Sequence, residues 1–156
     1  MNKKELIKGK IRDFQNHLPY QLIQRETRLP VNSGKIVTVT GIRRCGKTYI
    51  LYDTINRLLG SGVAKERILF LSFDDERFSF KTEEFDLILR AYRELFPDID
   101  LENVYIFFDE IQMSDNWEQF VRRIYDSETQ KIFLSGSNSK ILASDIATSL
   151  RGKTIQ

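Results

Sequence analysis

The chain has 156 residues, of which 41% are hydrophobic and 29% are charged, an ordinary composition for one globular domain. Its 24 basic and 22 acidic side chains nearly cancel, so the overall charge gives no reason to expect a nucleic-acid or membrane partner, although it does not exclude a local basic patch. A single cysteine, Cys45, excludes an intrachain disulfide and a cysteine-based metal cluster. The first residues lack the apolar core of a signal peptide, and no apolar run is long enough to cross a membrane. We therefore expect a cytoplasmic protein with no membrane segment.

An amphipathic helix is predicted over residues 3–17, ending before Pro19. The apolar positions that follow the helical period are Leu6, Ile7, Ile11, Phe14 and Leu18. Residues 21–28 are compatible with a short second helix. We interpret residues 1–31 as a helical leader without identifiable chemistry and residues 32–156 as the main domain.

The most specific pattern is a phosphate-binding loop, G-x-x-x-x-G-K-[ST], formed by Gly41, Ile42, Arg43, Arg44, Cys45, Gly46, Lys47 and Thr48. Its glycines permit backbone angles that a Cβ would forbid, so successive N–H groups can face an anion. Lys47 is expected to contact the β- and γ-phosphates, and the Thr48 hydroxyl to ligate Mg²⁺. Tyr49 opens the next helix, whose N-terminal partial positive charge faces the same phosphates, and we count it among the nucleotide-binding residues.

The surroundings of this loop have the pattern that such a site requires. Residues 35–40 are β-branched and predict a strand, whereas residues 49–59 predict a helix. The alternative is a simple glycine turn between the two. A second strand is predicted over residues 67–73, and an acidic turn follows it at residues 74–77. This turn would lie on the rim where α/β sheets bind ligands. The alternative is a plain solvated loop. Thr82 is expected to cap a third helix.

A second chemical motif follows the apolar run of residues 104–108, which is typical of a strand buried on both faces. Two carboxylates, Asp109 and Glu110, come directly after it, and Asp109 lies 62 positions after Lys47. This arrangement is the Walker B pattern. We expect Asp109 to hold Mg²⁺ through the water shell of the ion, and Glu110 to orient and deprotonate the attacking water.

A further helix is predicted to begin at Ser114 or Asp115, followed by a strand over residues 131–135. The polar turn after that strand would lie beside the Walker B carboxylates. Ser137 and Asn138 are the leading candidates to sense the γ-phosphate or to place the water. The alternative is that a serine of this turn only caps the following helix.

Together these motifs resemble a prokaryotic group of AAA+-type P-loop ATPases. The resemblance rests on the segments GIRRCGKTYIL at 41–51, FFDEIQ at 107–112, IFLSGSNS at 132–139 and SLRGK at 149–153. It implies an α/β protein with a three-layer α/β/α P-loop NTPase fold of the RecA/AAA+-like type. It further implies a parallel sheet in the order 5-1-4-3-2, ATP and Mg²⁺ as ligands, and a switch or motor role.

The resemblance also implies a further C-terminal domain. Members of the group usually close this segment with Gly-Arg, a position suited to an arginine finger. Here Lys153 occupies that position and Arg151 lies two residues earlier, and a lysine does not reproduce the bidentate fork of arginine.

The fifth strand would be largely missing, because only residues 153–156 remain for it. The first strand would then have a thinly covered edge, which tends to recruit other strands. We therefore expect a C-terminally truncated fragment of a longer protein, which on its own self-associates or hydrolyses ATP poorly. The alternative is a complete protein whose N-terminal helix covers the gap beside the first strand.

The leading functional hypothesis is Mg²⁺-dependent ATP binding and hydrolysis that drives conformational change in a larger protein, with Lys47 and Glu110 as central residues. The alternative is a nucleotide-operated switch that hydrolyses little and presents a surface to DNA or a protein. Glu110 favours hydrolysis, because a pure switch needs no general base. The sequence is also compatible with a homo-oligomer. A small-molecule kinase would need an arginine-rich lid, and a GTPase an Asn-Lys-x-Asp signature, and the sequence contains neither.

Overall fold

The computed structural model describes residues 2–19, 29–40, 46–76, 79–136 and 154–155. Its strands are β1 (Val37–Thr40), β2 (Ile68–Ser72), β3 (Tyr105–Asp109), β4 (Ile132–Gly136) and β5 (Thr154–Ile155). Its α-helices are α1 (Lys3–Asn16), α2 (Lys47–Gly60), α3 (Asp86–Leu95) and α4 (Trp117–Ser127). Short 3₁₀ turns occur at Lys65–Arg67, Thr82–Glu84, Leu101–Asn103 and Ile111–Met113. In the described parts of the chain, none of the helices is both long and apolar enough to cross a lipid bilayer.

The strands form one parallel sheet in the order β2-β3-β4-β1-β5. This is the predicted order, and the predicted fold class is confirmed. β5 contributes only two residues, which pair with Thr38 and Val39 of β1. The residues of β1, β3 and β4 are all buried, as expected for parallel strands covered on both faces.

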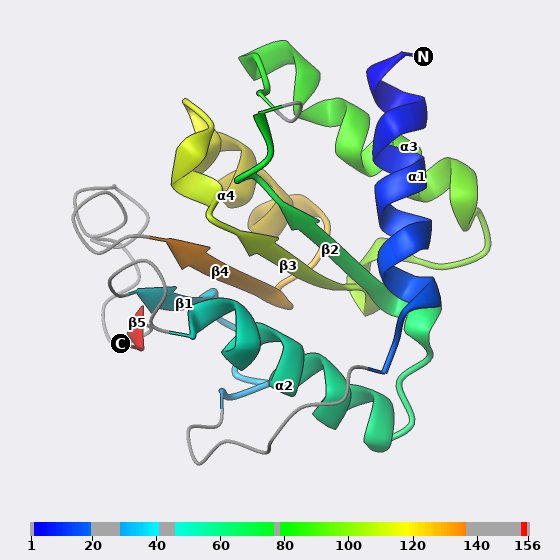
Figure 1. Cartoon of the computed structure of the whole chain (residues 1–156), viewed down its shortest axis with the longest axis vertical. Helices are drawn as coiled ribbons and strands as arrows, with labels where there is room; N and C mark the ends of the chain where they lie inside the picture. Colours follow the sequence, from blue (N-terminus) through cyan, green and yellow to red (C-terminus); the bar gives the residue numbers. More distant parts are fainter. Residues whose placement is uncertain (1, 20–28, 41–45, 77–78, 137–153, 156) are drawn as a thin grey trace.

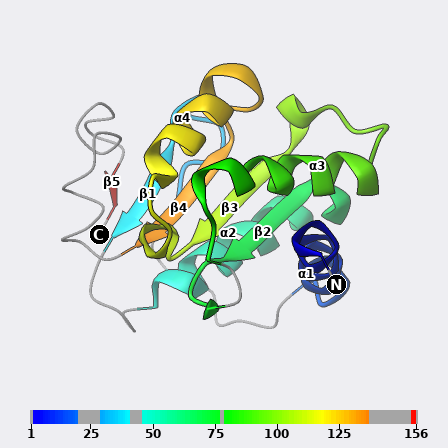
Figure 2. The same ribbon diagram turned by 90° about the horizontal axis from the view of Figure 1, so that it is seen from above.

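Helices cover both faces of the sheet and give it three layers. Figure 2 shows α2 on one face and α3 with α4 on the other. Side chains alternate along β3, so that Ile106 and Phe108 join the core under α3 and α4, whereas Tyr105 and Phe107 join the core under α2. Burial of these two apolar layers is the main force that holds the sheet between its helices.

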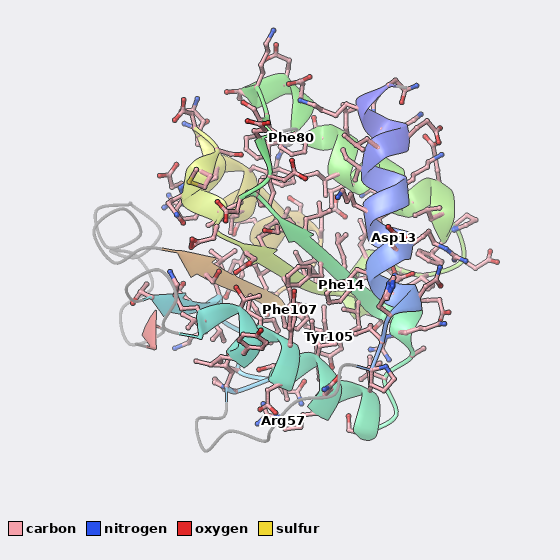
Figure 3. All side chains as sticks on the ribbon, in the orientation of Figure 1. Asp13, Phe14, Arg57, Phe80, Tyr105 and Phe107 are labelled. Atoms are coloured by element: carbon pink, nitrogen blue, oxygen red, sulfur yellow. The ribbon has the colours of Figure 1, made fainter. Side chains whose placement is uncertain are left out.

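α1 lies along the β2 edge of the sheet (Figure 1). Ile7 and Ile11 are fully buried in the core shared with α3 and α4. Phe14 stacks on Phe70 of β2 with ring centroids 4.2 Å apart, and Figure 3 shows it pointing toward the core of Tyr105 and Phe107. The helix thus shares the core of the main domain.

Two further kinds of contact fix α1 at this edge. The buried Gln15 side chain donates a hydrogen bond from Nε2 to the carbonyl of Ile68, at 2.9 Å, which satisfies an acceptor at the open side of β2. On the surface, Lys4 and Lys8 both pair with Glu94 of α3, at 2.8 and 2.7 Å. The alternative placement of this helix beside β1 is therefore wrong, because β5 pairs there and α1 closes the opposite edge.

Two helix starts come later than expected. α3 begins only after the 3₁₀ turn Thr82–Glu84, since the buried Phe85 is held between Phe80 and Phe120, with centroid distances of 5.5 and 4.8 Å. α4 begins at Trp117, because a 3₁₀ turn and Asn116, in the left-handed region with φ 62°, come first.

Candidate functional site

The site lies at the carboxyl edge of the sheet. Figure 1 shows the arrowheads of β1, β3 and β4 and the start of α2 on the same side of the molecule. The last residue of the phosphate-binding motif before α2, Gly46, has φ 82° and ψ 17°, a left-handed conformation that glycine adopts at little cost. The sharp turn at Gly46 directs the chain into α2, so Lys47 and Thr48 occupy the first turn of that helix.

Lys47 is buried at this edge, with 6% of its surface exposed. Its ammonium group lies 3.2 Å from Oε1 of Glu110 and donates to the carbonyl oxygen of Gly136 at 2.9 Å. A buried charge is tolerated only when it is paired and hydrogen-bonded, and both conditions are met here. The ion pair joins two residues that lie 63 positions apart in the chain, one from each motif.

Thr48 and Asp109 meet beside this pair. The Thr48 hydroxyl lies 3.2 and 3.0 Å from the two carboxylate oxygens of Asp109. A hydroxyl and a carboxylate are hard oxygen ligands of the type that Mg²⁺ prefers, and Mg²⁺ commonly uses few protein ligands together with phosphate oxygens. The two residues therefore fit the predicted metal site.

Asp109 is 5% exposed. Burial raises the pKa of its carboxyl group, while hydrogen bonds from Ser135 and Thr48 act in the opposite direction by favouring the ionised form. A divalent cation beside the carboxylate would favour the ionised form in the same way.

Glu110 has an uncommon backbone conformation for a residue with a side chain, with φ 54° and ψ 46°. Such a conformation typically costs about 1–3 kcal/mol and tends to occur at functional sites. This conformation turns the backbone at the end of β3, so that the strand does not continue. The Glu110 carboxylate faces Lys47.

Ser135, at the end of β4, belongs to the site although the sequence did not single it out. It is fully buried; its hydroxyl donates to Oδ1 of Asp109 and accepts the backbone N–H of Glu110 at 3.0 Å. A polar residue near the end of an apolar strand that neighbours β3 is the signal by which it could have been found. The predicted candidates in the following turn, Ser137 and Asn138, lie outside the described residues.

A family model for the AAA domain matches residues 33–156 of the chain. The chain belongs to the AAA domain family. An uncharacterized protein of Methanocaldococcus jannaschii is 37% identical over 138 residues, which cover 87% of this chain and 29% of that relative. An uncharacterized protein of Haemophilus influenzae is 30% identical over 121 residues, covering 78% of this chain and 30% of the relative. This AAA domain thus spans less than a third of the length of either relative.

The AAA domain brings together four of the residues predicted from sequence: Lys47, Thr48, Asp109 and Glu110. Tyr49 follows them on α2, is 51% exposed, and packs edge-on against Tyr52 at 6.0 Å. The remaining loop residues, Gly41, Ile42, Arg43, Arg44 and Cys45, lie outside the described residues, as do Arg151 and Lys153. Among the described residues, no group of three or more His, Cys, Asp or Glu side chains gathers to form a larger metal centre.

Proposed function

We propose that this AAA domain binds ATP with Mg²⁺, hydrolyses it, and drives conformational change in a larger protein. The observation that carries the proposal is the mutual contact of the P-loop residues Lys47 and Thr48 with the Walker B residues Asp109 and Glu110 at one edge of the sheet. A lysine, a hydroxyl and two carboxylates in this order are what triphosphate binding and water activation require.

In the proposed complex, Thr48 and Asp109 would hold Mg²⁺. When bound, the ion neutralises charge on the phosphate oxygens. Lys47 would bind the β- and γ-phosphates, assisted by the N-terminal partial charge of α2. Because the Lys47 ammonium contacts Glu110 and the Gly136 carbonyl in this structure, its engagement with phosphate would exchange these contacts for new ones.

That exchange would release Glu110 for chemistry. Its carboxylate would accept a proton from water as the water oxygen bonds to the γ-phosphorus. The bond from the γ-phosphorus to the bridging oxygen then breaks, and ADP and inorganic phosphate leave. Glu110 is 7% exposed, so it would act in a site with little competing solvent.

The second candidate function is a nucleotide-operated switch that presents a surface to DNA or a protein and hydrolyses little. The observation that favours it is the ion pair between Glu110 and Lys47, which keeps the proposed base engaged. In either case the proposal assigns a partner and any homo-oligomeric assembly to a larger protein, consistent with the greater length of the relatives.

Phosphate release at saturating MgATP distinguishes the two functions. The Glu110→Gln variant keeps the size of the side chain but removes the base, so turnover should fall by roughly 10²–10⁴ while ATP remains bound. An exposed carboxylate away from the site, Glu83, provides the matched control as Glu83→Gln. Normal turnover in Glu110→Gln would rule out the assigned base. Tight ATP binding without phosphate release by the unmodified protein would favour the switch.

A further inference from the structure

Ser135 connects the two carboxylate residues of the site. Pairing between β3 and β4 runs from Ile106–Ile132 to Phe108–Leu134. Beyond this point, the left-handed turn at Glu110 carries the chain away from β4. Its backbone N–H donates instead to the Ser135 hydroxyl, at 3.0 Å. A side chain of β4 therefore continues the connection between the strands where the backbone ladder has ended.

The direction of both hydrogen bonds follows from the chemistry of a hydroxyl group. A serine hydroxyl has one proton to donate and two lone pairs to accept with. Since the backbone N–H of Glu110 can only donate, the Ser135 oxygen accepts there, and its proton is free to bind Oδ1 of Asp109. One hydroxyl thus orients the carboxylate of one residue and the backbone of the next.

Burial makes this hydroxyl hard to replace. Ser135 has 0% of its surface exposed, and Asp109 has 5%. If the hydroxyl were removed, the Glu110 N–H and one Asp109 oxygen would each lose a partner where bulk water has little access. The left-handed conformation of Glu110 would lose one of the contacts that hold it.

We propose that Ser135 is a positioning residue that fixes the Asp109 carboxylate for a divalent metal ion and, through the same hydroxyl, fixes the backbone of Glu110. This inference rests on the proposed function and adds to it a role for β4. Removing a residue that hydrogen-bonds to a metal ligand and orients it typically lowers metal affinity or activity by roughly 10–100-fold.

The test is a titration of the 156-residue chain with Mn²⁺ in the presence of ADP, followed by electron paramagnetic resonance. In Ser135→Ala the apparent Mn²⁺ affinity should fall by roughly 10–100-fold. ADP binding without any divalent ion, measured by calorimetry, should stay within about twofold, because the Ser135 hydroxyl bonds to Asp109 and Glu110, whereas the phosphates are expected to bind the phosphate-binding loop and the start of α2. Ser135→Thr keeps the hydroxyl and should recover most of the Mn²⁺ affinity.

Thr129→Val is the matched control. Thr129 is also buried, donates to the Val104 carbonyl and accepts the Lys131 N–H, both at 3.1 Å, at the opposite edge of the sheet. The Thr129→Val variant should be less stable than the unmodified chain but should bind Mn²⁺ with the same affinity. Circular dichroism verifies that each variant is folded.

Three outcomes would overturn the inference without overturning the proposed function. The first is an Mn²⁺ affinity in Ser135→Ala equal to that of the unmodified chain. The second is an equal loss of metal-free ADP binding, which would indicate general disruption of the site. The third is a folded Ser135→Thr variant whose Mn²⁺ affinity is as low as that of Ser135→Ala. If the unmodified chain binds no Mn²⁺ with ADP, the proposed function fails together with the inference.

Discussion

Lys47 and Glu110 form a buried ion pair, and each has a different proposed task once a nucleotide is bound. Their positions in the two motifs were predictable from sequence, because the motifs specify residue types in order. Their contact was not, because it depends on the left-handed conformation of Glu110, which residues with a side chain seldom adopt. The role of Ser135 was equally hidden, since it depends on how the ends of β3 and β4 separate.

The single substitution Asp109→Asn separates metal binding from base chemistry. The amide keeps the size of the carboxylate but not its charge, so we expect the Mg²⁺ concentration for half-maximal phosphate release to rise by roughly 10–100-fold. Nucleotide binding without metal should change little. The measurement is a Mg²⁺ titration of turnover.

Asp126 is an exposed aspartate of α4 and provides the matched control as Asp126→Asn. This variant should keep the original Mg²⁺ requirement. An unchanged Mg²⁺ requirement in Asp109→Asn would remove Asp109 from the metal site.

The element whose place the sequence did not predict is α1. Its helical period was clear, and the helix runs over Lys3–Asn16 as expected. Nothing in an amphipathic pattern specifies which apolar surface will receive it. The structure puts it against β2, where Gln15 binds the Ile68 carbonyl and three lysines reach carboxylates of α3 and its preceding turn.

The surface ion pairs of α1 with Glu94 make the stability of the fold depend on pH. Hydrogen bonds from Lys4 and then Lys8 lower the pKa of Glu94 from 4.5 to about 2. A carboxylate whose pKa is lower in the folded than in the unfolded protein stabilises the fold above its unfolded pKa, and this contribution is lost as pH falls through the folded pKa. Glu94→Gln should therefore be slightly less stable than the unmodified protein near pH 7, with the difference narrowing from pH 4.5 toward pH 2.

Urea unfolding at low salt over this pH range measures the difference. The effect should be small, since exposed ion pairs contribute little and are screened by salt. Glu83 is another exposed glutamate of the same region, and Glu83→Gln is the control for the substitution itself. A stability difference for Glu94→Gln that is constant from pH 7 to pH 3 would contradict the account.

For the whole molecule, the α/β class was predictable, because apolar runs of strand length alternate with helical patterns. The strand order followed from the resemblance to AAA+-type ATPases and agrees with the observed order. The family model supports the same conclusion over residues 33–156. The packing of the leader helix was not predictable, because it depends on contacts between residues far apart in the chain, such as Gln15 and Ile68.

The central claim is that the edge formed by α2, β3 and β4 is a triphosphate site. Calorimetric titration of MgATP into the unmodified chain and into Lys47→Ala tests it most directly, with circular dichroism to verify that the variant is folded. We expect saturable binding at one site in the unmodified chain and a loss of most of the affinity in Lys47→Ala, because the Lys47 ammonium group is a buried cation at this edge. A folded Lys47→Ala variant that binds ATP as tightly as the unmodified chain would contradict the account.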